Sequence, residues 1–279
     1  MAKPILEVDF RVINSTKPLF AALAEFSKKT VPALIKEKAG LFARYLAENT
    51  QPVDGMGGTD PDGGSLKARD LGRSAVRRDI SKVYCGPGDA FSILRNKVAG
   101  INGDSKPLAK AFYALLKQGR IQDARNLLRE GGASVSIDVS EWDNGAMHKQ
   151  RRNKKGRVGR SYSPTAIGDK KALKAYIKKK TEMVGFAKAG WVNAAKQLGE
   201  KGLSKIRGWI KKHRDAPGKA SDLTGDEARP RILLRNGVDY APQTLDERQF
   251  NRTIEQFEDA VEAELKAKIK ALEAKQNKK

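Results

Sequence analysis

The stretch RILLRNGVDYAPQTLDERQFNRTIEQFEDAVEAELKAKIKAL, residues 231–272, decides the fold class of this 279-residue chain. Its first part, Arg231–Arg235, predicts a short strand, and the turn signal Asn236-Gly237 follows it. Asp246 is a typical helix N-cap, and a long run with helical spacing comes after it. The apolar residues of that run form one stripe: Phe250, Ile254, Phe257, Val261, Leu265, Ile269 and Leu272. A strand that leads into a long amphipathic helix indicates an α+β protein.

The N-terminal part of the chain predicts a second strand and two further helices. Residues 5–13 alternate apolar and polar side chains with a period of two, which is typical of a half-buried strand. One helix is expected to begin near Pro18 and another after Thr30, because proline suits a first helical turn and threonine an N-cap. We therefore predict a helix-rich α+β fold, with a small antiparallel sheet packed against long helices that include the C-terminal one.

The central part of the chain reads as short elements joined by loops. Helical spacing recurs over residues 71–83, 108–116 and 121–128. Residues 134–140 alternate and predict another strand. Two stretches rich in small and turn-forming residues predict loops: 50–65 and 216–228.

Positive charge is concentrated after this central part. Between Met147 and Lys180 the chain carries thirteen Lys or Arg residues and one acidic residue. The first half reads HKQRRNKKGRVGRSYSP and predicts a polar loop, and a long helix is expected to begin at Gly168-Asp169. Apolar residues recur every seven positions along that helix: Ile177, Val184, Trp191 and Leu198. A basic amphipathic helix over residues 203–210 is expected to follow.

The charge pattern suggests a division of the chain into three parts. Residues 1–145 form the N-terminal part of the α+β core and contain the glycine-rich loop 50–65. Residues 146–215 form a basic loop and helical module. Residues 216–279 supply the C-terminal strand and the long helix that complete the core.

Composition excludes several classes of protein. The net charge is +22, from 55 Lys and Arg against 33 Asp and Glu, which favours acidic or polyanionic partners. The single cysteine, Cys85, excludes an internal disulfide framework and fits a reducing compartment. No apolar run approaches the roughly 18 residues of a membrane span, so we expect a soluble protein made inside the cell with no membrane partner.

The residues that commonly carry catalysis or bind metal are sparse. Cys85, His148 and His213 lie in three distant segments with no metal-ligand spacing, so no metal and no cofactor are expected. The sequence also lacks a nucleophile elbow and a phosphate-binding loop, which argues against an enzyme. We interpret the two histidines as solvated and the thiol as buried. Trp191 is expected in the core, and Trp142 either at its edge or as an interface anchor.

The polar loop of the basic stretch is the strongest candidate for a contact surface. Lysine and arginine side chains on phosphates release counterions and give salt-dependent affinity, and Tyr162 is available to stack on an unpaired base. The same charges would also fit an acidic protein surface. The proposed basic contact patch consists of Arg151, Arg152, Lys154, Lys155, Arg157 and Arg160.

Two segments resemble one known family. LFARYLAENT, residues 41–50, closes the second predicted helix and runs into QPVDG, residues 51–55. Near the C-terminus the strand at 232–235 leads into Asn236 and then Tyr240-Ala241. Both segments resemble the tail-completion (neck, head–tail joining) proteins of tailed bacteriophages, whose first long helix runs into a T-P-V-D-T-G loop and whose later strand ends in N-x-x-x-Y-A. Here Gln51 stands between the threonine and the proline, and the basic middle of the chain resembles an insertion.

The resemblance implies a structural virion protein, made in the host cytoplasm and placed in the virion at the neck. Members of this family form homo-oligomeric rings, so the implied partners are further copies of the chain, the portal or adaptor, and the tail terminator or tube. The implied docking loop, between subunits or rings, is Pro52, Val53, Asp54 and Gly55. The basic patch would then meet acidic partners or make non-specific contact with packaged DNA. The alternative is a stand-alone basic protein that binds DNA or RNA.

Overall fold

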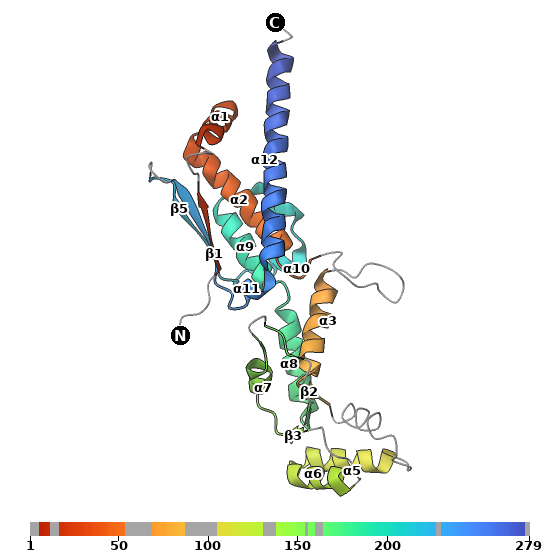
Figure 1. Cartoon of the computed structure of the whole chain (residues 1–279). Coiled ribbons are helices and arrows are strands. Elements are labelled where there is room, and N and C mark those ends of the chain that lie inside the picture. The colour runs from red at the N-terminus through yellow and green to blue at the C-terminus, as the bar shows by residue number, and fades with distance from the viewer. Residues whose placement is uncertain are drawn as a thin grey trace. The chain divides into compact units, whose positions relative to one another are not determined.

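The structure is a computed structural model that describes residues 6–11, 17–53, 68–86, 105–130, 138–153, 156–159, 164–226 and 230–276. The chain divides into two compact units. Unit 1 consists of residues 1–69 and 185–279, and unit 2 of residues 70–184. Unit 2 is therefore one continuous stretch of the sequence, which follows the first part of unit 1 and precedes its second part (Figure 1). This division differs from the three parts drawn from the charge pattern, since the basic segment 146–215 is shared between the two units.

Unit 1 confirms the predicted fold class, a helix-rich α+β fold with a small antiparallel sheet and a long C-terminal helix. Its described elements are β1 (Leu6–Arg11), α1 (Lys17–Ser27), α2 (Val31–Asn49), α9 (Phe186–Gln197), the 3-10 helix η1 (Lys201–Lys205), α10 (Gly208–Lys211), β5 (Gly218–Leu223), β6 (Arg231–Asn236), α11 (Ala241–Thr244) and α12 (Glu247–Gln276). The sheet has the order β1-β6-β5, so the N-terminal strand and the C-terminal strand pair directly.

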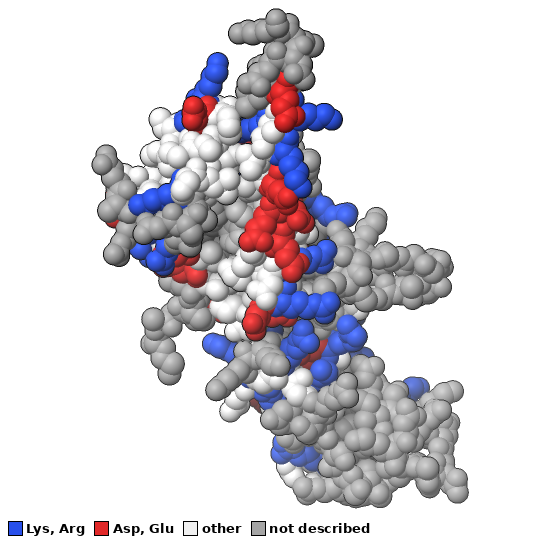
Figure 2. All heavy atoms as spheres, turned by 45° about the horizontal axis from the view of Figure 1, so that its top comes forward, with Lys and Arg blue, Asp and Glu red and all other residues white. Residues whose placement is uncertain are grey.

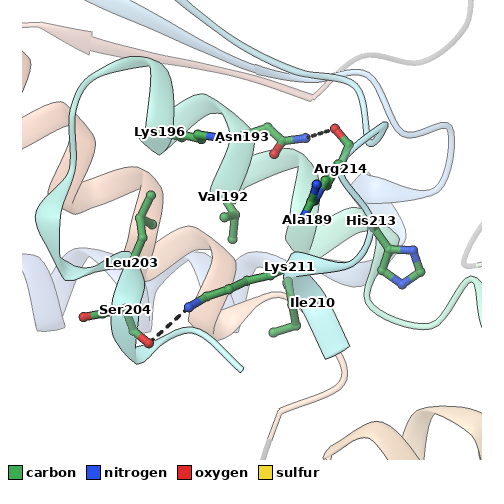
Figure 3. Close-up of a pocket in the computed structure, with 10 residues that line it drawn as sticks. All are labelled: Ala189, Val192, Asn193, Lys196, Leu203, Ser204, Ile210, Lys211, His213 and Arg214. Atoms are coloured by element: carbon green, nitrogen blue, oxygen red, sulfur yellow. Dashed lines mark hydrogen bonds between the residues drawn. The ribbon is translucent and has the colours of Figure 1, made fainter. Parts of the chain in front are cut away.

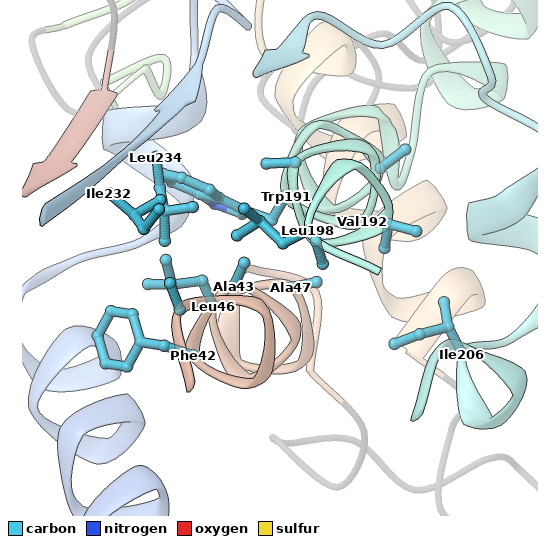
Figure 4. Packing of buried hydrophobic residues seen from close by; sticks show 14 of the residues in the cluster. Phe42, Ala43, Leu46, Ala47, Trp191, Val192, Leu198, Ile206, Ile232 and Leu234 are labelled. Carbon is cyan, nitrogen blue, oxygen red and sulfur yellow. The ribbon is translucent and has the colours of Figure 1, made fainter. Parts of the chain in front are cut away.

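The sheet buries one face against helices. Phe10 pairs with Ile232 across the antiparallel ladder, and both side chains face the core. Trp191 is fully buried and extends from α9 toward Ile232 and Leu234 of β6 (Figure 4). On the α12 side, the ring of Phe257 meets the ring of Phe10 edge-on at 5.5 Å between centroids. The two predicted strands, β1 and β6, thus pair with each other, and the long helices pack against the buried face of their sheet.

A buried cation joins α2 to α9. Lys188 of α9 is only 3% exposed, and its Nζ donates hydrogen bonds of 2.9 Å to the backbone oxygens of Ala47 and Glu48. Those carbonyl groups lie at the C-terminal end of α2, where a helix carries partial negative charge. The contact therefore holds the C-terminal end of α2 against α9.

Polar side chains also join α2 to α12. The buried Asn49 donates to the Thr253 hydroxyl at 3.1 Å and to Gln256 Oε1 at 2.7 Å. Lys38, buried in α2, forms an ion pair with Glu264. Two turns of α12 are thereby held in one register on α2.

Unit 2 is built around a small parallel sheet. Its described elements are α3 (Ala68–Ser81, whose first two residues belong to unit 1), β2 (Tyr84–Cys85), α5 (Ser105–Lys117), α6 (Ile121–Glu130), β3 (Asp138–Ser140), α7 (Ala146–Gln150), β4 (Thr165–Ile167) and α8 (Lys170–Glu182). The strands have the order β2-β4-β3 and are parallel. Its main core cluster consists of Ile80, Val83, Tyr84, Val158, Ile167 and Leu173. Trp142 is half-buried and packs against this core, as expected for the edge position; its role as an interface anchor stays a prediction.

The sequence prediction was wrong about the loop at 216–228. Residues 218–223 form the edge strand β5. The segment lacks a clear apolar alternation, and its strand conformation depends on neighbours: β6 pairs with one side, and the Gln197 side chain of α9 reaches the backbone of Gly218 and Ala220 at 2.9 and 3.0 Å. Tertiary contacts, not local propensity, make this strand.

The single long helix expected from Asp169 to Leu198 is also wrong. Asp169 does cap α8, accepting the Ala172 N–H at 2.9 Å, but α8 ends at Glu182 and α9 begins at Phe186. Gly185 between them has φ +95, a left-handed conformation that a continuing helix does not contain. The seven-residue spacing therefore comes from two helices in different units.

Smaller differences lie in the basic stretch. The expected polar loop contains the short helix α7 and is followed by the unexpected strand β4. The expected basic helix at 203–210 is the 3-10 helix η1 followed by the four-residue α10. Strands of two or three residues are too short to show a period in the sequence.

The close approach of β5 to α9 gives a test of the core of unit 1. A methyl group at Gly218 would overlap the backbone carbonyl of Gly190. We expect Gly218→Ala to lower the free energy of unfolding by about 1–3 kcal/mol, since backbone atoms must move apart. The control is Gly208→Ala, where a methyl group would meet no atom within 4 Å. Urea denaturation measures both; equal effects of the two changes would contradict this packing.

Candidate functional site

The structure describes half of the predicted basic contact patch. Arg151, Arg152 and Arg157 lie in unit 2, whereas Lys154, Lys155, Arg160 and the nearby Tyr162 lie outside the described residues. Residues 152 and 158 form an isolated antiparallel bridge. Within it, Arg152 Nε donates to the Gly156 carbonyl at 2.7 Å, and the Asn153 N–H donates to the Arg157 carbonyl at 2.9 Å. The described parts of the expected polar loop, residues 151–153 and 156–159, therefore bond to each other.

A half-buried carboxylate of α3, Asp79, anchors this segment. Asp79 accepts the Val158 N–H at 2.7 Å through Oδ1, and His148 Nε2 lies 3.0 Å from Oδ2. Arg152 Nε lies 3.5 Å from the same Oδ2. Burial by itself would raise the pKa of Asp79, but the hydrogen bonds from His148 and Val158 and the charge of Arg152 outweigh it and lower the pKa below its ordinary value.

A chain of polar side chains continues from Asp79 through His148 to Tyr176. His148 Nδ1 lies 2.9 Å from the Tyr176 hydroxyl. Because the ionised Asp79 only accepts, the neutral imidazole carries its proton on Nε2 and accepts the Tyr176 O–H at Nδ1. The expectation of solvated histidines was wrong: His148 is buried in unit 2, and His213 is buried in unit 1.

A second carboxylate holds α7, which carries His148. Asp143 accepts the N–H groups of Gly145 and Met147 and the Tyr84 hydroxyl, which lies 2.6 Å from Oδ1. Burial opposes ionisation of Asp143, but these hydrogen bonds lower its pKa; burial and the neighbouring carboxylate raise the pKa of Tyr84. The Tyr84 hydroxyl in turn accepts the His148 N–H at 3.1 Å. The network therefore fixes both the backbone and the ring of His148.

Four cationic side chains lie close to this network: Lys149, Arg152, Lys179 and Lys180. Lys180 Nζ lies 5.4 Å from the centre of the Tyr176 ring. Its pKa is lowered, first by burial and then by the positive charges of Arg152, Lys179 and Lys149. The part of this lowering that comes from the neighbouring cations reflects repulsion between like charges. An anion placed among them would relieve that repulsion, which makes this cluster the candidate site for a polyanion.

Sequence reasoning included one of these four cations, Arg152, in its contact patch and missed Lys149, Lys179 and Lys180. All lie within the basic stretch, but only folding brings the end of α8 next to α7 and the 152–158 bridge. The high local charge was the available signal. It indicates a basic region without saying which members share a face.

The predicted docking loop lies in unit 1 and is only partly described. Pro52 and Val53 follow the end of α2, whereas Asp54 and Gly55 lie outside the described residues. The Gln51 N–H donates to the Thr244 carbonyl of α11 at 2.7 Å. The loop set and the basic patch therefore belong to different units.

The residues that carry the C-terminal part of the resemblance have structural roles. Buried Asn236 donates to the Ala187 carbonyl at 2.8 Å and accepts the Val238 N–H at 3.2 Å. Tyr240 is the N-cap position of α11, and Ala241 is fully buried. These contacts fix the passage from β6 to α12.

Unit 1 also carries an acidic band, which stands out in a chain of net charge +22. Figure 2 shows acidic side chains gathered along one face of the long C-terminal helix. The exposed members on α12 are Glu255, Glu258, Asp259 and Glu262. Acidic side chains thus gather on one stretch of α12, a feature that the net charge of the chain conceals.

The part of the chain that the structure describes contains no candidate metal site and no candidate membrane-spanning helix. No cluster of three or more His, Cys, Asp or Glu side chains is arranged to hold a metal ion there. None of the helices described has the length and apolar character needed to cross a membrane. Cys85 is buried in β2, as expected for a small apolar thiol.

Comparison with known proteins gives no relative. No family model, no curated protein and no solved structure matches the chain.

The role of Asp79 is testable through pH. Because its folded pKa lies below the unfolded value, its contribution is present above that value and is lost as pH falls through the folded pKa. We expect Asp79→Asn to lower the free energy of unfolding by about 1–3 kcal/mol near neutral pH. The difference from the native chain should shrink in acid.

The matched control for this prediction is Asp123→Asn, which removes an exposed carboxylate paired with Arg120 on the surface of unit 2. An exposed pair of this kind contributes about 0–1 kcal/mol. Urea denaturation at several pH values gives both results. An Asp79 variant as stable as the control variant at neutral pH would contradict the anchoring role.

Proposed function

We propose that this chain is a non-enzymatic structural protein of a tailed bacteriophage, which joins the head to the tail at the neck as part of a homo-oligomeric ring. Support comes from where the two resembling segments lie. The first contains Gln51, whose N–H donates to the carbonyl of Thr244 in α11, the helix that begins at Ala241 of the second. Segments almost two hundred residues apart in sequence thus adjoin in unit 1.

The intervening residues support the same proposal. Residues 70–184 form their own compact unit, so unit 1 retains a strand, a long helix, a second strand and a closing helix without them. The resemblance implies three of these elements in that order: the long helix, the later strand and the closing helix. Unit 2 is then an insertion that brings the basic surface to the ring, for contact with an acidic neighbour or with passing DNA.

A second candidate function is that of a stand-alone nucleic-acid-binding protein. The feature that favours it is the group of cations around Lys180, namely Lys149, Arg152 and Lys179, which a phosphate backbone would neutralise. This candidate requires no ring. The two proposals differ in oligomeric state and in affinity for nucleic acid at physiological salt.

Oligomeric state tests the ring. Light scattering of the purified protein at high salt, where non-specific polyanion binding is suppressed, is expected to show a closed oligomer or a monomer that assembles on portal-like rings. Electron microscopy of the particle from which the protein comes should then place it in a ring on the symmetry axis. A protein that stays monomeric with every ring offered, and is absent from particles, would exclude the neck role.

Salt dependence tests the basic surface. Removing two phosphate contacts with Lys179→Ala and Lys180→Ala is expected to flatten the slope of log affinity for duplex DNA against log salt by about two units. The matched control is Lys110→Ala with Lys117→Ala on α5, which removes the same charge elsewhere in unit 2. If both pairs change the slope equally, the contact is a general effect of net charge and not a property of the cluster.

A further inference from the structure

A hollow of about 610 Å³ lies on the surface of unit 1 between α9, η1 and α10 (Figure 3). Its size is within the range of about 300–1,000 Å³ that ligand sites occupy. Its floor is apolar. The side chains that form the floor are Ala189, Val192, Leu203 and Ile210.

The rim of this groove is basic. Lys196, Lys211 and Arg214 line it and are exposed, and none of its lining residues is acidic. Among the described residues, no carboxylate forms an ion pair with any of these three side chains. Lys211 lies across the groove and donates to the Ser204 carbonyl at 3.1 Å, so its ammonium group is held at the opening (Figure 3).

The groove is formed by parts of unit 1 that are fixed in the core. Val192 and Ile210 belong to the main buried cluster. Asn193 of α9 donates to the carbonyl groups of Arg214 and Ala216 at 3.2 and 2.7 Å, which ties the segment after α10 to α9. The His213 ring packs edge-on against Phe186 at 5.6 Å between centroids and points away from the floor. The walls therefore do not need a ligand to form.

A groove with an apolar floor and a cationic rim favours a ligand that carries both apolar and negatively charged groups. A phosphate backbone would satisfy the rim but would place no apolar group on the floor. We propose that the groove docks an acidic amphipathic segment of a partner protein, with an apolar side chain on Val192 and Leu203 and carboxylates on Lys196, Lys211 and Arg214. Grooves that take the apolar face of a partner helix are a common recognition mode.

A second copy of this chain fits the groove less well. The acidic band on α12 is its richest source of exposed carboxylates, but the apolar stripe of that helix is occupied within unit 1: Phe250, Ile254 and Phe257 pack against the main core. Along the acidic band, from Glu255 to Glu262, α12 thus presents no exposed large apolar side chain beside its carboxylates; its exposed Ile269 lies beyond the band. The proposal concerns a different protein and does not depend on the neck role.

Fluorescence anisotropy with a labelled peptide of Glu-Leu-Leu-Glu repeats tests this docking. The full-length protein is expected to bind it, and a peptide with serine in place of leucine should bind much more weakly. The triple change Lys196→Glu, Lys211→Glu and Arg214→Glu is expected to weaken binding by about tenfold or more. The matched control makes the same charge change at exposed sites elsewhere on unit 1: Lys17→Glu, Lys219→Glu and Lys270→Glu.

A second variant separates shape from charge. Ser204→Trp places a large ring at the exposed rim and keeps every charge, so it is expected to block the peptide while circular dichroism and thermal unfolding stay unchanged. Equal loss in the two triple variants, equal binding of the serine peptide, or unchanged binding by Ser204→Trp would each overturn the proposal. Self-association that the groove changes abolish would also overturn it, because the occupant would then be a second copy.

Discussion

Lys188 brings a positive charge into the core of unit 1, where it meets the carbonyl oxygens at the C-terminal end of α2. Removing an ammonium group from water costs several kcal/mol, which these hydrogen bonds and the negative end of the helix dipole offset. The contact fixes α9 against α2 at one position. Trp191 of α9 then packs against β6, and Asn236 of β6 donates a hydrogen bond to the Ala187 carbonyl of α9. These contacts bring the edge strand β5 close to α9, where Gly218 lies next to Gly190.

The same logic of buried polar groups organises unit 2, with a different outcome. Asp79, His148 and Tyr176 form a hydrogen-bonded chain whose members are largely removed from water. Such a network is stable only when each member has a partner. Its effect is to hold α3, α7, α8 and the 152–158 bridge together, so that lysines and arginines from three of these segments share one surface. The basic surface is therefore a product of the core beneath it.

The candidate site was only partly predictable. Charge counting located the basic stretch, and of the predicted patch Arg152 is the member whose charge acts on Lys180. Lys179 and Lys180 were missed as members of the same surface because they lie in α8, whereas Lys149 lies in α7 and Arg152 just after it, and spacing along one helix does not reveal a contact between elements. His148 was misjudged because its partners Asp79 and Tyr176 lie 69 and 28 residues away. The groove beside α9 had no sequence signal, since its floor residues look like ordinary core.

The sequence by itself determined the fold class, the ends of α2 and the course of α12, because apolar spacing and capping residues act over a few positions. The Asp246 cap, with its reciprocal bonds to Gln249, is of this local kind. Only the tertiary structure decided that residues 70–184 form a separate unit, that 218–223 is a strand, and that the helix breaks at Gly185. Each of these depends on a partner distant in sequence, and no local pattern records which partner will be present.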